Sequence, residues 1–176
     1  MAGLDDSRPF HPLRIAVLTV SDSRTEETDT SGATLVSRLQ TAGHTLVEKV
    51  IVADEQDLLE AQLRAWIADP GVEVVLTTGG TGVTGRDVTP EAVLAVSDKE
   101  IPGFGEHFRR VSYPHIGLSC IQSRALATVA QGTYLFAMPG STGACRDAWD
   151  EILVFQLDGR YRPCNFAELM PRLREV

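Results

Sequence analysis

Strand-like and helix-like patterns alternate along this chain, and that order limits its fold more than any other feature. Runs of β-branched and aliphatic residues predict buried strands at residues 14–20 (RIAVLTV), 46–52, 72–78 (VEVVLTT) and 133–137. Apolar side chains at helical spacing predict helices at residues 32–42 and 54–68. This order is typical of an α/β protein: we expect a three-layer α/β/α fold with a mostly parallel central sheet.

The second half of the chain continues the pattern with two less regular segments. Thr89 and Pro90 are expected to open a helix, as its N-cap and first helical residue. Residues 104–111 predict a short helix, and residues 119–129 predict a helix that passes into a strand. The turn at residues 131–132 (QG) then adds one antiparallel strand pair.

The length and charge of the chain restrict its organisation and partners. Its 176 residues suit one domain at residues 14–166, between a flexible N-terminal segment (1–13) and a C-terminal tail (167–176). The net charge of −8 disfavours nucleic acid and anionic membranes as partners, and no apolar stretch could span a membrane. Three scattered cysteines and the absence of a visible signal peptide indicate a cytoplasmic protein with reduced thiols.

A glycine-rich loop follows the third predicted strand at residues 79–87 (GGTGVTGRD). Its spacing satisfies G-x-G-x-x-G, but Pro90 starts the next helix about five residues too late for a dinucleotide-binding turn. A P-loop requires lysine and a hydroxyl residue where Arg86 and Asp87 stand. Two interpretations remain: a phosphate-binding loop of another kind, and a plain strand-to-helix connection.

Carboxylates and arginines near this loop suit magnesium and phosphate chemistry. Asp87 beside the loop is suited to holding Mg²⁺ together with phosphate oxygens. Asp54 is a second candidate, although a residue before a helix is also a natural N-cap. Arg86, Arg109 and Arg124 are candidate phosphate contacts, and Ser123, which precedes Arg124, is a candidate hydrogen-bond donor.

A second short glycine loop, at residues 139–142 (PGST), also joins a predicted strand to a predicted helix. Its hydroxyl groups are suited to an anion, while Ser141 is equally suited to a simple helix N-cap. Asp22 and Asp29 lie in the polar loop after the first strand, and no pattern distinguishes them from ordinary solvated turn residues.

Residues 77–82 (TTGGTG) and 86–92 (RDVTPEA) resemble the signature of the molybdopterin-binding MoaB/MogA family. Further matches follow in the same order, and together the resemblance spans about residues 13–166. They are residues 19–24 (TVSDSR), 29–32, 54–56 (DEQ), 101–106 (IPGFGE), 122–124 (QSR) and 138–140 (MPG). Residues 137–149 and 162–166 are similar to the MoaB branch, whereas the MogA branch usually carries P-G-x-P where Ser141 and Thr142 stand.

The resemblance implies a protein that binds molybdopterin at the strand ends and adenylylates its terminal phosphate with Mg-ATP. Asp54 and Asp87 would be the catalytic carboxylates and would hold Mg²⁺. The substrate and phosphate contacts would be Ser21, Asp22, Gly79, Gly80, Thr81, Gly82, Arg86, Phe104, Gly105, Ser123, Arg124, Pro139, Gly140 and Ser141. The resemblance also implies a homotrimer or homohexamer, and transfer of the product to a metal-insertion protein.

Two other functions are compatible with the same resemblance. A non-catalytic protein would bind or carry molybdopterin, as expected of family members that lack the matching carboxylates. A scaffold would resemble the gephyrin-like relatives. Asp54 and Asp87 are both present here, which favours an enzyme, and the sequence shows no linker or partner domain that would favour a scaffold.

Overall fold

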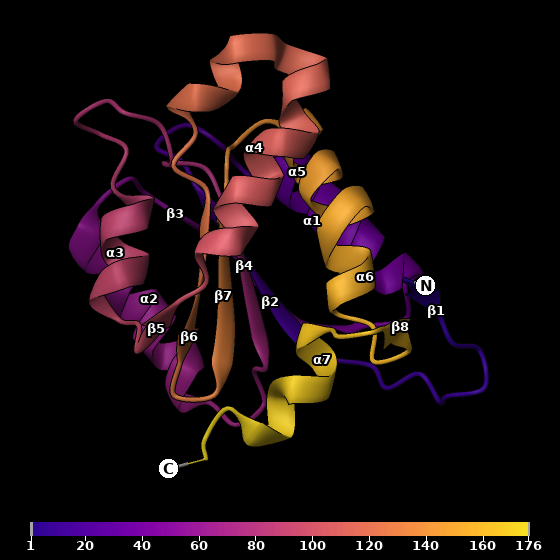
Figure 1. Cartoon of the computed structure of the whole chain (residues 1–176). Coiled ribbons are helices and arrows are strands. Elements are labelled where there is room, and N and C mark those ends of the chain that lie inside the picture. The colour runs from indigo at the N-terminus through magenta and orange to yellow at the C-terminus, as the bar shows by residue number, and fades with distance from the viewer. Residues whose placement is uncertain (1, 176) are drawn as a thin grey trace.

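A six-stranded sheet forms the middle layer of the protein (Figure 1). The computed structural model describes residues 2–175. In spatial order the strands are β3 (Thr45–Val52), β2 (Arg14–Val20), β4 (Val74–Thr78), β7 (Thr133–Met138), β6 (Leu126–Ala130) and β5 (Lys99–Glu100). The first four are parallel neighbours, whereas β6 runs antiparallel to both β7 and β5. The expected α/β fold with a mostly parallel sheet is therefore confirmed.

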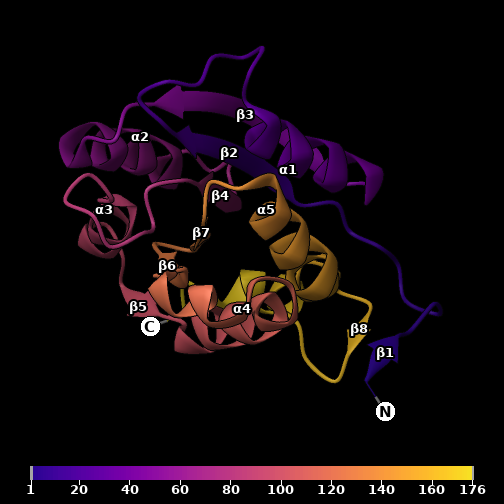
Figure 2. The same ribbon diagram turned by 90° about the horizontal axis from the view of Figure 1, so that it is seen from above.

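Helices cover both faces of this sheet (Figure 2). On one face lie α1 (Thr30–Thr41), α4 (Pro102–Ile116) and α5 (Thr142–Ala148), and on the other lie α2 (Gln56–Ala68) and α3 (Thr89–Ala95). Successive side chains of a strand point to opposite faces, so Ile15 packs in the first layer and Ala16 in the second. Trp149 and Trp66 fill the two layers as buried core residues.

Three helix boundaries differ from the sequence prediction. Helix α1 begins earlier, because the Asp29 side chain accepts a hydrogen bond from Gly32 N–H (2.9 Å) and caps it. Thr89 is the first residue of α3 rather than its N-cap, and its hydroxyl donates to the Gly79 carbonyl (2.9 Å). Helix α4 continues through Pro114 to Ile116, because a proline in the last turn removes few helical hydrogen bonds.

The helical segments that follow α4 and α5 are shorter and less regular. The 3₁₀ helix η1 (Gly117–Gln122) follows α4 and leads into β6, as residues 119–129 predict. Helix α5 continues as a π-helix, η2 (Trp149–Leu153), and then as α6 (Val154–Gln156). Of the three cysteines, Cys120 and Cys145 are buried, and Cys164 is exposed.

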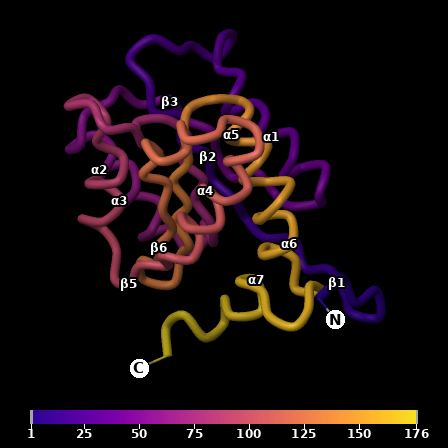
Figure 3. Tube along the Cα trace, turned by 45° about the horizontal axis from the view of Figure 1, so that its top comes forward, coloured from indigo at the N-terminus to yellow at the C-terminus, as the bar shows by residue number. Residues whose placement is uncertain are grey.

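The N-terminal segment lies beside the part of the chain that follows α6 (Figure 3). Strand β1 (Gly3–Leu4) pairs antiparallel with β8 (Tyr161–Arg162), a pair that the sequence did not reveal. Helices α7 (Phe166–Leu169) and η3 (Met170–Arg172) follow, and Phe166 packs against the core. Parts of the N-terminal segment and of the tail thus contact the domain, while their flexibility stays a prediction.

His44 is a buried titratable group beside the start of β2. The residue is only 5% exposed, and its Nδ1 accepts a hydrogen bond from Leu13 N–H (3.1 Å). Only a ring with an unprotonated Nδ1 can accept that bond. Burial lowers the pKa of His44 below its usual 6.5, although the nearby Asp158 carboxylate opposes this shift. The folded protein therefore favours neutral His44.

This preference makes stability depend on pH. Below about pH 6.5 the unfolded chain binds a proton at His44 more readily than the folded protein does. We expect the free energy of unfolding to fall as the pH is lowered from about 7.5 to about 5.5, which urea titrations at both pH values would measure. His44→Asn keeps an acceptor for Leu13 and should show a smaller fall. An equal fall in both proteins would contradict the assignment.

Candidate functional site

The ends of β4 and β7 bring the two glycine loops side by side. These strands are parallel neighbours, so their carboxyl ends lie at the same edge of the sheet. A Cβ atom on Gly140 would lie 3.2 Å from Gly79 Cα. Gly79 itself has φ +108°, and a Cβ there would lie 2.2 Å from the Val20 carbonyl oxygen. Only glycine fits this position, and the loops form a site where open α/β sheets bind ligands.

The backbone of the first glycine loop turns its carbonyl oxygens toward the protein. The carbonyls of Gly79 and Gly80 accept hydrogen bonds from Thr89 Oγ1 (2.9 Å) and Thr89 N–H (3.1 Å). The carbonyls of the next two residues accept from Arg124 N–H (2.9 Å) and Nε (2.6 Å). The N–H groups of Gly80 and Thr81 have no acceptor within residues 2–175. The loop therefore keeps donors for an anion.

Four charged side chains surround this loop: Asp22, Asp54, Arg86 and Asp87. Asp22 accepts hydrogen bonds from Asp54 N–H (3.1 Å) and from Arg86 Nη2 (2.6 Å). A Cβ on Gly80 would lie 2.9 Å from Asp54 Oδ1, and a Cβ on Gly82 would lie 2.7 Å from Asp87 Oδ2. The two predicted catalytic carboxylates thus approach the loop closely.

The surroundings of these carboxylates shift their pKa values in opposite directions. Burial raises the pKa of Asp54, and the charges of Asp22 and Asp87 raise it further against the effect of Arg86. Hydrogen bonds from the Thr84 hydroxyl (2.6 Å) and N–H (2.9 Å) help to hold the pKa of Asp87 below its usual value. Asp54 does not cap α2, because the N-cap position belongs to the next residue.

This arrangement fits a cation that arrives together with phosphate groups. Within residues 2–175, no group of three or more His, Cys, Asp or Glu side chains is placed to hold a metal ion. Mg²⁺ commonly uses one or two protein carboxylates together with water and substrate phosphates. A bound cation would also relieve the repulsion between Asp54 and its neighbouring carboxylates. Asp54 and Asp87 are therefore suited to Mg²⁺ that enters with a polyphosphate.

Arg124 joins the segment before β6 to the glycine loop. Besides the Gly82 carbonyl, its guanidinium donates to the Asp87 carbonyl (2.6 Å) and to the Glu91 carboxylate. All of its guanidinium nitrogens therefore have partners within the protein. Arg124 positions the loop and the backbone of Asp87, and its contact with phosphate stays a prediction.

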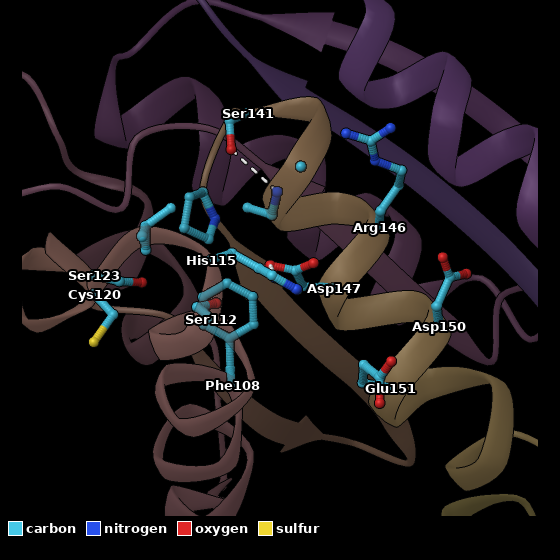
Figure 4. Close-up of a pocket in the computed structure, with 14 residues that line it drawn as sticks. Phe108, Ser112, His115, Cys120, Ser123, Ser141, Arg146, Asp147, Asp150 and Glu151 are labelled. Atoms are coloured by element: carbon cyan, nitrogen blue, oxygen red, sulfur yellow. Dashed lines mark hydrogen bonds and ion pairs between the residues drawn. The ribbon is translucent and has the colours of Figure 1, made fainter. Parts of the chain in front are cut away.

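A cavity of about 500 Å³ lies on the other side of the second glycine loop, between α4, η1 and α5 (Figure 4). Three predicted substrate contacts line it: Ser123, Pro139 and Ser141. Ser141 also caps α5, because its Oγ accepts a hydrogen bond from Ala144 N–H (3.1 Å), drawn as the dashed line in Figure 4. The proposed N-cap role of Ser141 is thus confirmed, and its position leaves it beside the cavity.

Three other predicted contacts have clear structural roles. Phe104 is 4% exposed and lies in the core, with its ring 5.2 Å from that of Phe136. Gly105 lets α4 approach β6, since a Cβ there would lie 2.3 Å from the Ala125 carbonyl oxygen. The hydroxyl of Ser21 accepts two backbone hydrogen bonds in the turn that follows it. The contact of these three residues with substrate stays a prediction.

Comparison with known proteins relates nearly the whole chain to the family that its sequence motifs resemble. The sequence model of the family described as "Probable molybdopterin binding domain" matches residues 16–159. Over 160 residues the chain is 56% identical to "Molybdenum cofactor biosynthesis protein B" of Escherichia coli (strain K12), covering 91% of this chain and 94% of that protein. The chain belongs to the molybdenum cofactor biosynthesis protein B family. Its identity to the member from Bacillus subtilis (strain 168) is 46% over 146 residues, or 82% of this chain and 86% of that protein.

Solved structures of the molybdenum cofactor biosynthesis protein B family share the fold. One of them superposes with a TM-score of 0.86 at 40% identity, covering 96% of this chain and all of that chain. The "tungsten cofactor synthesizing protein MoaB from Pyrococcus furiosus" superposes with a TM-score of 0.75 at 31% identity, covering 93% and 98%. The expected MoaB/MogA-like architecture is confirmed. Across residues 2–175, none of the helices combines the length and apolarity needed to cross a membrane.

Several residues at the site of this protein were not predicted from the sequence. Thr84 and Glu91 support Asp87 and Arg124, and Glu91 lies within the RDVTPEA motif that could have drawn attention to it. Ser112, His115 and Asp147 line the cavity from two different helices. Their spacing is that of ordinary helix surfaces, so only the packing of α4 against α5 reveals that they face one another.

Proposed function

We propose that this protein adenylylates the terminal phosphate of molybdopterin with Mg-ATP in the cytoplasm. A phosphate oxygen of molybdopterin forms a bond to the α-phosphorus of ATP, and the bond from that phosphorus to the β-phosphate bridging oxygen breaks. The products are adenylyl-molybdopterin and pyrophosphate, and no protein nucleophile is required. The observation that carries this proposal is the pair Asp54 and Asp87, both of which lie close to glycines of a loop with free N–H donors.

The protein's contribution is to hold two anionic substrates together. The N–H groups of Gly80 and Thr81, which have no acceptor within residues 2–175, would donate to phosphate oxygens, and Arg86 would add positive charge near them. Asp54 and Asp87 would hold Mg²⁺, which neutralises charge that develops on the triphosphate during transfer. Thr84, Thr89 and Arg124 keep the loop in one conformation, so that these groups need little rearrangement when the substrates bind.

Release of pyrophosphate tests this proposal directly. The purified protein is incubated with ATP and Mg²⁺, with and without molybdopterin, and a parallel sample contains excess EDTA. We expect release only when both molybdopterin and Mg²⁺ are present. If the protein binds molybdopterin but releases no pyrophosphate, it is a non-catalytic binding or carrier protein. In the proposed pathway, the adenylylated product would then pass to a metal-insertion protein.

Exposed apolar side chains at the end of α4 and in η1 support the expected homotrimer or homohexamer. Tyr113, Ile116, Leu118 and Ile121 are exposed where α4 passes into η1, and the last two are 71% and 70% exposed. Contiguous apolar surface of this kind is typical of protein interfaces. We expect light scattering to give the mass of three or six chains, and Leu118→Asp to lower it. An unchanged mass in the variant would place the subunit interface elsewhere.

A further inference from the structure

The proposed reaction does not use Asp29, a buried carboxylate at the start of α1. The residue is 2% exposed, so it is not an ordinary solvated turn residue. Burial alone would raise the pKa of Asp29, but hydrogen bonds from Lys49, Gly32 and Thr19 together hold this pKa below its usual value. The carboxylate is therefore ionised at neutral pH. It forms an ion pair at 2.9 Å with Lys49 Nζ, whose side chain is itself largely buried.

The two oxygens of Asp29 join three elements of the fold. Oδ1 accepts from Gly32 N–H (2.9 Å) and caps α1, whereas Oδ2 accepts from the Thr19 hydroxyl of β2 (2.7 Å) and from Lys49 of β3. A Cβ on Gly32 would lie 2.3 Å from Oδ2, so a larger residue there would displace the carboxylate. A buried ion pair adds little stability over apolar side chains of similar volume, and its value can lie in fixing one arrangement. These contacts fix the first turn of α1 against β2 and β3.

Helix α1 carries this position to the second glycine loop. The helix lies beside α5 (Figure 2). The hydroxyl of Thr30, its first residue, lies 3.0 Å from the hydroxyl of Thr142, the last residue of the loop. The first residue of the loop is held by the sheet instead, because the Pro139 carbonyl accepts a hydrogen bond from the Thr78 hydroxyl of β4 (3.0 Å). The loop is thus anchored at one end by β4 and at the other by α1.

We propose that Asp29 is a positioning residue for the second glycine loop. Its ion pair with Lys49 fixes the first turn of α1, and the hydrogen bond between Thr30 and Thr142 passes this constraint to the loop. The inference rests on the proposed function, because the loop supplies predicted substrate contacts. Asp29 itself is buried and acts through α1. A loop without this anchor would be competent for binding in only a fraction of the molecules, and the apparent affinity falls by that fraction.

Thr30→Val separates this role from the stability of the fold. Valine has the shape of threonine without the hydroxyl, so Asp29 keeps its ion pair while the hydrogen bond to Thr142 is lost. Isothermal titration calorimetry of the full-length protein, in the absence of ATP, would give the affinity for molybdopterin. We expect the affinity to fall by about threefold to tenfold, which is the range of one neutral hydrogen bond. The midpoint of urea unfolding should change little, because both hydroxyls lie near the surface.

Two further variants control this measurement. Thr34→Val is the matched control, because the Thr34 hydroxyl donates to a carbonyl of its own helix (2.7 Å), and this variant should keep the normal affinity. Asp29→Asn keeps an acceptor for the cap but removes the charge that binds Lys49, and should lower the affinity at least about tenfold. If both residues act along one path, Asp29→Asn combined with Thr30→Val should bind no more weakly than Asp29→Asn alone. If Asp29→Asn does not fold, the comparison of Thr30→Val with Thr34→Val decides.

Kinetic measurements distinguish a positioning role from a general loosening of the site. In the pyrophosphate assay, Thr30→Val should raise KM for molybdopterin and leave both kcat and KM for Mg-ATP unchanged, because only binding of one substrate is weakened. Two results would overturn the inference: an unchanged affinity for molybdopterin in Thr30→Val, or losses in Asp29→Asn and Thr30→Val that multiply in the double variant.

The proposed function can fail separately. If Thr30→Val binds molybdopterin more weakly while the unaltered protein releases no pyrophosphate, the positioning role stands and the adenylylation does not. If the unaltered protein releases pyrophosphate and Thr30→Val has the same affinity and the same KM for molybdopterin, the adenylylation stands and the positioning role does not.

Discussion

Asp87→Asn is expected to slow molybdopterin-dependent pyrophosphate release at least about a hundredfold. Hydrogen bonds from Thr84 help to hold the pKa of Asp87 low, so this side chain is ionised at neutral pH. Asparagine has nearly the same shape and can still accept from Thr84, but it lacks the negative charge that would hold Mg²⁺. Initial rates at saturating Mg-ATP and molybdopterin would measure the effect.

A second carboxylate variant controls for the general effect of removing a negative charge. Asp69 is exposed at the C-cap of α2, the opposite end of this helix from Asp54, so Asp69→Asn should keep the rate of the unaltered protein. Urea unfolding of both variants would show whether either substitution changes the stability of the fold. If folded Asp87→Asn releases pyrophosphate at the normal rate, Asp87 does not hold the metal ion in this reaction.

Gly79→Ala is expected to destabilise the protein by roughly 3 kcal/mol or more, since backbone strain and a steric clash act together. The residue has φ +108°, and the added Cβ would lie 2.2 Å from the carbonyl oxygen of Val20. That oxygen belongs to the buried strand β2 and cannot turn aside as a flexible side chain could. Urea titration monitored by tryptophan fluorescence would give the change in unfolding free energy.

Gly85→Ala is the control for this prediction, because it lies in the same loop. A Cβ at Gly85 meets no atom within 4 Å, and its φ is not in the left-handed region. Its effect should stay within about 0.5 kcal/mol. Equal losses in the two variants would mean that the loop relaxes around Gly79. A Gly79→Ala protein that fails to fold beside a normal Gly85→Ala would support the prediction.

The strand and helix pattern was predictable because each layer of the fold has its own periodicity in the sequence. Residues 14–20 and 72–78 are rich in β-branched and aliphatic side chains, as is typical of strands buried on both faces, and they contain β2 and β4. The pair β1–β8 was not predictable, since strands of two residues have no period and form only when distant segments meet. The continuation of α4 through Pro114 was also not predictable, since a proline usually marks the end of a helix.

The site was predictable where its residues share a segment with a recognisable motif. Asp54 and Asp87 were chosen from the sequence, and the structure brings both to the glycine loop. The function of Arg124 was harder to predict, because a sequence does not tell whether a guanidinium contacts a ligand or neighbouring carbonyl groups. Asp147 carries no signal at all: it lies on a helix surface, and only the facing helix α4 turns that surface into a cavity wall.

The different exposure of the three cysteines has a practical consequence for labelling. Burial raises the pKa of the Cys145 thiol to about 11, and Cys120 is buried as well, so both should react slowly with thiol reagents. Cys164 is exposed beside β8, at the end of the chain that packs far from the glycine loops. A maleimide dye should therefore attach at one position per chain without mutagenesis. Mixing donor-labelled and acceptor-labelled protein would then test the proposed oligomer by energy transfer while the glycine loops stay unmodified.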